Sequence, residues 1–278
     1  MILRAIHPAA TVRAIGDFLR VMVRHRELIA AMAKRDIGSR FAGQVLGSLW
    51  AVLHPLVLIC VYIVLFAFVF NIRMPEGMEF ERSYTTYLLS GLVPWIVFQE
   101  IIIRSSTAVT ENDNLVKQVV FPIEVLPVKS VLSSMVVPII AFTVLLLQGA
   151  VESGLPAIAV LLPLLLLLQL IAMVGIAMLL AAVGVYLRDL KDIAQVGCFI
   201  TIYATPIFYL PDWVPSGLKP ITYLNPFSYM VWCYRDLVYY GRFEHPWAWL
   251  VFTFFALLSF AIGYRVFRRL KPGFGSVL

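Results

Sequence analysis

The feature that most limits how this chain can fold is a series of apolar runs longer than a soluble core needs. Residues 45–70 contain no Lys, Arg, Asp or Glu across 26 positions, whereas a bilayer crossing needs about 20 apolar residues. Over the whole sequence, 61% of the residues are hydrophobic and only 14% are charged. Lipid must therefore be part of the solvent, and we predict an all-α integral membrane protein.

Six apolar segments are expected to cross the bilayer, within a single transmembrane domain that spans residues 1–278. The predicted spans are residues 45–70, 84–104, 128–148, 157–187, 193–210 and 247–264. In the second span, Glu100 and Arg104 lie one helical turn apart and can pair, although we expect Arg104 to extend towards water instead. Gly43 and Gly47, at the start of the first span, have the spacing that allows two helices to approach closely.

Two further segments are apolar without forming a complete span. Residues 14–35 place apolar side chains at helical spacing and charges on another face, which predicts an amphipathic helix in the headgroup region. Residues 211–245 mix several prolines with aromatic residues. This segment is too interrupted for one crossing and too apolar for a loop, so we expect short helices that re-enter the membrane or cap it.

Basic residues are concentrated at the two ends of the chain. Residues 1–43 hold eight Lys or Arg against three acids, and residues 265–278 hold four against none. If the N-terminus is cytoplasmic, 17 bases lie at the inner side and five at the outer side, which satisfies the positive-inside bias and puts both termini in the cytoplasm. No cleavable signal peptide is expected, because the first apolar stretch is short and charges follow it. Nucleic acid is not an expected partner, since the bases flank apolar segments without a base-reading motif.

The sequence offers no machinery for catalysis. It has no nucleotide-binding, metalloprotease or hydrolase motif, so we expect no catalytic residue and no metal site, and the work of ATP must come from a partner. Cys60, Cys198 and Cys233 are isolated and are expected to pack in apolar runs. An ion-coupled secondary transporter is a more distant alternative, because His54 and Glu100 are the main ionisable candidates within the spans.

The connection between the second and third spans is the most informative segment. Residues 111–127 read ENDNLVKQVVFPIEVLP, in which one of the first three polar residues after Glu111 can cap a short helix and Pro122 ends it. The apolar residues of this helix are Leu115, Val116, Val119, Val120 and Phe121. A short apolar helix at the cytoplasmic side must be buried against the membrane surface or against a partner, and the residues alone leave both interpretations open.

Four segments in this order resemble the permease subunit of type 2 ABC exporters that move polysaccharides such as O-antigen, capsule and teichoic acid chains. They are MAKRDIGSRFAGQVLGSLWAVLHPL (32–56), NLVKQVVFPIEVLPV (114–128), YLRDLKDI (186–193), and TPIFYLP followed by LNPF (205–211 and 224–227). The resemblance covers nearly the whole chain. It implies a location in the bacterial inner membrane, a homodimer that encloses the path, and two separate cytoplasmic ABC ATPase subunits. The ATP and Mg then belong to those ATPases, and no cofactor is implied for this chain.

The resemblance also assigns roles to segments. It implies that residues 111–127 hold a coupling helix seated in a cleft of the ATPase, that the N-terminal amphipathic helix lies at the same interface, and that residues 211–245 form the outer mouth. The coupling residues are then Asn114, Leu115, Val116, Lys117, Val119, Val120 and Phe121. The implied substrate is a lipid-linked surface polysaccharide, with capsule ahead of O-antigen, and a periplasmic polysaccharide co-polymerase or export protein is a further partner. A permease for drugs or another small hydrophobic substrate is the nearest alternative.

Aromatic side chains are the candidates for lining the path, because sugar rings have apolar C–H faces that slide over aromatic rings. The candidates are Tyr62, Tyr84, Tyr87, Trp95, Phe98, Tyr203, Phe208, Tyr209 and Trp213. Each can equally belong to the aromatic belt found at membrane interfaces. Lys219, Arg235 and Arg242 in the outer segment can attract an anionic glycan or simply be solvated.

Overall fold

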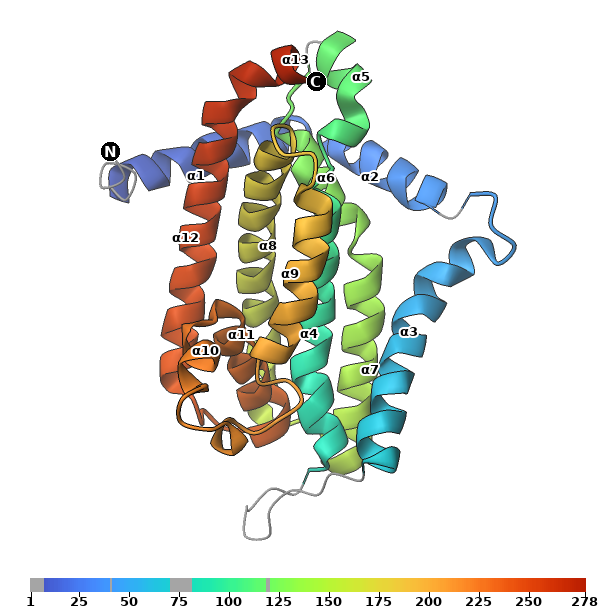
Figure 1. Cartoon of the computed structure of the whole chain (residues 1–278), viewed down its shortest axis with the longest axis vertical. Coiled ribbons are helices and arrows are strands. Elements are labelled where there is room, and N and C mark those ends of the chain that lie inside the picture. Colours follow the sequence, from blue (N-terminus) through green and yellow to red (C-terminus); the bar gives the residue numbers. More distant parts are fainter. Residues whose placement is uncertain (1–7, 41, 71–81, 119–120) are drawn as a thin grey trace.

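A computed structural model of the chain describes residues 8–40, 42–70, 82–118 and 121–278 (Figure 1). Within these residues the regular structure is entirely helical and includes no strand. The longer helices form a bundle. One end of the bundle carries α1, α2, α5 and α13 and is called the basic end below; α10 and α11 lie towards the other, called the opposite end.

The helices have the following bounds. The α-helices are α1 (Pro8–Arg24), α2 (Arg26–Arg40), α3 (Trp50–Ile63), α4 (Tyr84–Ser105), α5 (Asp113–Gln118), α6 (Val125–Ser133), α7 (Val136–Ser153), α8 (Leu162–Gly184), α9 (Leu190–Ala204), α10 (Lys219–Leu224), α11 (Pro226–Arg235), α12 (Pro246–Leu270) and α13 (Phe274–Val277). Short 3-10 turns lie at η2 (Gly47–Leu49), η4 (Thr110–Asn112), η5 (Ala157–Leu161), η6 (Pro211–Trp213) and η8 (Lys271–Gly273), and π-helical turns at η3 (Val64–Val69) and η7 (Asp236–Tyr240).

Five helical stretches in the described residues are long and apolar enough to cross a membrane. They are Gly47–Phe66, Tyr84–Ser105, Val125–Glu152, Ala157–Gly184 and Pro246–Val277. They overlap the first four predicted spans and the last one. The fifth prediction, 193–210, falls on α9, which has 15 residues and gives way to extended backbone at Thr205. Because about 20 residues are needed for a crossing, the six-span count stays a prediction.

The predicted amphipathic helix over residues 14–35 is instead two helices, α1 and α2, which meet at His25. Helical backbone hydrogen bonds continue across the junction, with His25 N–H donating to the Val21 carbonyl at 3.1 Å. The two helices are held by different neighbours. Phe18 of α1 lies 5.0 Å from Phe260 and 5.6 Å from Tyr264 of α12, whereas α2 packs on α6. The helical path therefore continues through His25 while its two halves pack on different neighbours, and the amphipathic pattern is pronounced only in α1.

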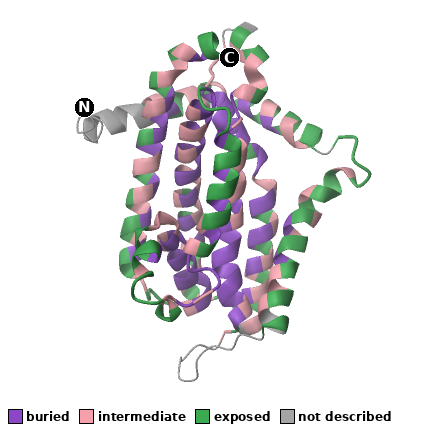
Figure 2. Cartoon of the chain, in the orientation of Figure 1, coloured by how far each residue is buried: buried purple, intermediate pink, exposed green. Residues whose placement is uncertain are grey.

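The core is built around α4 and α8, and Figure 2 shows the buried residues gathered on these central helices. The helix pair with the most extensive contact is α8 and α12, and its closest approach is made by two glycines. A Cβ at Gly263 would lie 1.9 Å from the Gly175 carbonyl oxygen, and a Cβ at Gly175 would lie 2.4 Å from the Phe260 nitrogen. The two backbones are therefore in direct contact, which only glycine permits.

The close approach predicted for Gly43 and Gly47 is wrong. These glycines have φ angles of 79° and 51°, and a Cβ on either would meet no atom within 4 Å. They supply the left-handed backbone of the turn between α2 and α3, which other residues rarely adopt. Beyond that turn, α3 stands at the edge of the bundle (Figures 1 and 2). In the most apolar stretch of Gly47–Phe66, only 11% of the residues are buried.

Candidate functional site

Ion pairs join three helices at the basic end. The Asp36 carboxylate of α2 accepts from Arg104 Nη2 of α4 at 2.6 Å and from Lys129 Nζ of α6 at 3.2 Å. Burial raises the pKa of Asp36, but a hydrogen bond from Ser133 and the charges of Lys129 and Arg104 outweigh it and hold that pKa below its usual range. Asp36 is therefore ionised and attaches α2 to the bundle.

A second acid beside this cluster, Glu100, shares Arg104 with Asp36. Glu100 Oε1 lies 2.7 Å from Arg40 Nη1 of α2 and 3.8 Å from Arg104 Nη1. Arg104 also donates to Ser134 Oγ at 3.0 Å, and its side chain is only 23% exposed. The expectation that Arg104 extends towards water is wrong, because two acids on different helices hold it inside the protein.

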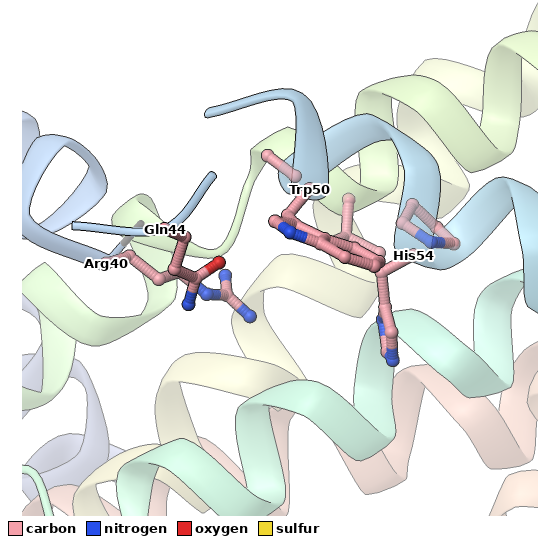
Figure 3. Close-up of a pocket in the computed structure, with 7 residues that line it drawn as sticks. Arg40, Gln44, Trp50 and His54 are labelled. Carbon is pink, nitrogen blue, oxygen red and sulfur yellow. The ribbon is translucent and has the colours of Figure 1, made fainter. Parts of the chain in front are cut away.

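Two adjoining cavities lie next to these ion pairs, where α2, α3, α4 and α7 meet. One encloses about 270 Å³, and Figure 3 shows Arg40 and Gln44 on one side of it, with Trp50 and His54 of α3 on the other. The second encloses about 250 Å³ and continues along Gln99, Glu100, Ile103 and Arg104. The walls thus combine guanidinium and imidazole groups with indole and aliphatic groups, and the Glu100 carboxylate in the second cavity pairs with Arg40 and Arg104.

The predicted coupling segment forms α5 at the tip of the basic end (Figure 1). Asn114, Leu115 and Lys117 are exposed there, and the Asn114 N–H donates to the side chain of the preceding Asp113, at 2.8 Å from Oδ1. Val116 is half-buried against the core. One side of α5 is therefore packed and the other is free for a partner.

The remaining coupling candidates are divided. Phe121 is half-buried against the core, and Val119 and Val120 lie outside the described residues. Glu124, three positions after Phe121, was not among the predicted site residues, yet it is buried and paired with Lys271. A carboxylate inside an otherwise apolar run, FPIEVLP, is the signal that could have indicated it.

Four of the predicted aromatic residues come together between α3, α4 and the connection after α9: Tyr62, Tyr84, Tyr87 and Phe208. Tyr62 and Phe66 stack with Phe208 at 5.3 and 4.9 Å, and the Tyr84 hydroxyl donates to the Phe208 carbonyl at 2.8 Å. Tyr87 lies 6.0 Å from Tyr84. Tyr87 has no exposed surface in this arrangement, and Phe208 is 8% exposed. Most of this cluster is therefore packing between helices.

The other aromatic candidates separate into two groups. Trp95 and Phe98 are fully buried and lie 5.1 and 4.9 Å from Phe227 of α11, so they belong to the core. Tyr203, Tyr209 and Trp213 instead line one open cavity of about 470 Å³ together with apolar residues of the proline-rich segment. These three are the predicted aromatic residues best placed to meet a ligand.

The proline-rich segment, residues 211–245, buries two charged residues that face away from water. Arg235 is fully buried, with its guanidinium 3.6 Å from the centre of the Tyr87 ring and Nη2 donating to the Ile207 carbonyl at 3.1 Å. Asp236 is also fully buried and accepts from Trp249 Nε1 at 3.1 Å and from the His245 backbone N–H at 3.2 Å. The expectation that Arg235 is solvated or attracts a glycan from solution is therefore wrong for this arrangement. Its position in a run of apolar and aromatic residues was the available signal.

Among the described residues, no group of three or more His, Cys, Asp or Glu side chains is placed to hold a metal ion. What the geometry offers is a short helix with an exposed side at one end, two cavities beside the ion pairs, and an aromatic cavity towards the other end. Residues 27–239 match the family described as ABC-2 type transporter, which is well over half of the chain. The chain belongs to the ABC-2 type transporter family.

Curated relatives of this ABC-2 permease cover almost its whole length. It is 27% identical over 263 residues to the O-antigen export system permease protein RfbA of Klebsiella pneumoniae, which covers 91% of this chain and 95% of the relative. It is also 27% identical over 227 residues to RfbA of Myxococcus xanthus, covering 81% and 85%. The polysialic acid transport protein KpsM of Escherichia coli is 23% identical over 243 residues, covering 86% and 92%. The resemblance drawn from the four sequence segments is confirmed.

Proposed function

We propose that this chain is the membrane permease of an ATP-driven exporter that moves a lipid-linked surface polysaccharide from the cytoplasm across the inner membrane. The family match supports the permease role, and the relatives are named for export of O-antigen and transport of polysialic acid. Polysaccharide is common to both names. The choice between a capsule and an O-antigen stays open.

The assembly that we propose contains two copies of this chain and two ABC ATPase subunits. The basic end faces the cytoplasm, which agrees with the positive-inside bias and with the position of α1 and α13 at the same end (Figure 1). The exposed side of α5 docks in the ATPase, and the apolar surface of α3 contacts lipid or the second copy. ATP then acts by binding one conformation of the complex more tightly than the other.

The observation that carries this proposal is the family match combined with α5, whose exposed Leu115 stands free at the tip of the bundle. Within the proposed path, Tyr203, Tyr209 and Trp213 offer open aromatic surface to the sugar rings. The cavities beside Arg40 lie at the cytoplasmic side, where a lipid-linked substrate would enter.

The docking claim is tested with Leu115→Glu in the full permease, co-purified with its ATPase. A carboxylate placed in an apolar contact should weaken the complex by about 2–3 kcal/mol, or roughly 30- to 150-fold in affinity, and abolish surface glycan in cells. Leu224→Glu is the matched control, because Leu224 is 82% exposed at the opposite end. If Leu115→Glu binds the ATPase like the control, α5 is not the docking helix. If loss of the permease leaves surface glycan unchanged, polysaccharide is not the substrate.

A further inference from the structure

An ion pair between a buried acid and a partly exposed lysine attaches the coupling segment to the last long helix. Glu124, which lies between α5 and α6, is 8% exposed, and both of its carboxylate oxygens lie 2.8 Å from Lys271 Nζ. Lys271 is the first residue after α12. The contact therefore joins two segments that are separated by 147 positions in the sequence.

The turn that carries Lys271 is held in place by its own packing. Phe274 is fully buried, 5.5 Å from Phe267 and 6.2 Å from Tyr186. The Tyr186 hydroxyl donates to the Leu270 carbonyl at 3.0 Å, and a Cβ at Gly273 would lie 2.4 Å from that hydroxyl oxygen. The position of Lys271 relative to α12 is therefore fixed.

The coupling helix meets the same C-terminal segment at a second point. Lys117 Nζ of α5 donates to the main-chain oxygen of Leu278 at 2.6 Å, and α5 packs against α13. The coupling segment is thus bonded to the continuation of α12 both at α5 and at Glu124. When a partner displaces α5 together with Glu124, either this continuation moves with them or the ion pair breaks. Breaking the pair is unfavourable because the Glu124 side chain is only 11% exposed.

α12 reaches from this contact to the proline-rich segment at the opposite end. It is held against α8 by the backbone contact at Gly175 and Gly263, so the pair is stiff. Near its other end, Trp249 of α12 donates to the buried carboxylate of Asp236. A continuous path of bonded and packed groups therefore runs from the coupling segment to residues 211–245.

We propose that Glu124 and Lys271 are positioning residues that transmit movement of the coupling segment to α12 and, through Asp236, to the proline-rich segment. This inference rests on the proposed function, since the movement comes from the docked ATPase. The two residues touch neither nucleotide nor glycan. Their role is to determine how far α12 moves when α5 is displaced.

The test uses the full permease with its ATPase in proteoliposomes, and measures glycan transported per ATP hydrolysed. Glu124→Gln and Lys271→Gln should each lower this ratio by roughly threefold to thirtyfold while the ATPase still co-purifies. The double variant E124K/K271E restores the opposite charges and should recover most of the ratio. Arg268→Gln is the matched control, because Arg268 lies near the same end of α12 but pairs with Asp17 at 3.4 Å in an exposed position.

A ratio that stays at the wild-type value in both single variants overturns the inference. Where a single variant does not fold, the double variant decides: folding restored together with the ratio supports a role in transmission, and folding restored without the ratio assigns the pair to stability alone. A wild-type chain that binds no ATPase or exports no glycan would instead contradict the proposed function, and is seen before any variant is made.

Discussion

The two ends of the bundle hold their charges in different ways. At the basic end, Asp36 and Glu100 share three cations between them, and the side chains in these pairs are 9–32% exposed. At the opposite end, Arg235 and Asp236 are fully buried, and Asp236 is held by donors from the chain that follows it, at His245 and Trp249.

The two ends differ in whether a charged group that loses its partner can find another one. Arg104 lies within reach of both Asp36 and Glu100, and Arg40 is 32% exposed to water, so the ion pairs of these two arginines can exchange at small cost. The buried groups at the opposite end have no such replacement, because an unpaired polar group inside the protein costs the full desolvation penalty. We therefore expect the basic end to tolerate rearrangement during a transport cycle and the proline-rich segment to move as a unit.

The largest effect is expected at Asp236. Replacing it with Ala leaves the N–H groups of His245 and Trp249 unpaired and should destabilise the protein by about 3 kcal/mol, measured by denaturant unfolding in micelles. Glu244→Ala is the control, because Glu244 makes an exposed ion pair with Arg242 that is worth less than about 1 kcal/mol. Equal stability of the two variants would show that the buried Asp236 contributes no more than an exposed acid of the same segment.

The next effect tests whether the two ends are joined stiffly. Gly263→Ala pushes α12 away from the Gly175 backbone and should cost about 1–3 kcal/mol, with a lowered thermal midpoint. Gly197→Ala in α9 is the matched control, since a Cβ there would meet no atom within 4 Å; it should raise stability by about 0.5–1 kcal/mol through helix propensity. A Gly263→Ala protein as stable as Gly197→Ala would mean that α8 and α12 do not depend on backbone contact.

The sequence predicted most of the bundle because membrane crossings depend on local composition. Long apolar runs located the regions of five long helices, and a proline-rich aromatic segment was recognised as something other than a span. The break at His25 was not predictable in the same way, because residue 25 carries no local signal that ends a helix. The end of α9 does have one: Pro206 directly follows Thr205, and a residue before proline is biased away from helical backbone.

The site was predicted less completely, for a physical reason. The exposed residues of α5 could be chosen from the sequence, since an apolar helix between two spans has to be covered by something. Partners across the fold could not: Arg104 was assigned to Glu100 or to water because only the neighbour one turn away is visible in sequence, and Asp36 lies 68 positions away. Glu124 and Lys271 were missed for the same reason.

The smallest effect is expected at the basic end, from Asp36→Asn. Two cations and Ser133 face this carboxylate, but the side chain is 23% exposed, so screening limits the loss to about 1 kcal/mol at pH 7. Asp17→Asn, an exposed acid on α1, is the control and should change stability by less than about 0.5 kcal/mol.

The pH dependence of this small effect identifies its origin. Because folding lowers the pKa of Asp36, its charge contributes stability above the ordinary value of 3.8, and that contribution is lost as the pH falls through the lower folded-state pKa. Wild type and Asp36→Asn should therefore differ in unfolding free energy at pH 7 and converge only below pH 3.8. A constant difference across that range would assign the loss to the hydrogen-bond geometry of the carboxylate, and a difference near that expected for Asp236→Ala would show that the basic end is no more tolerant than the opposite end.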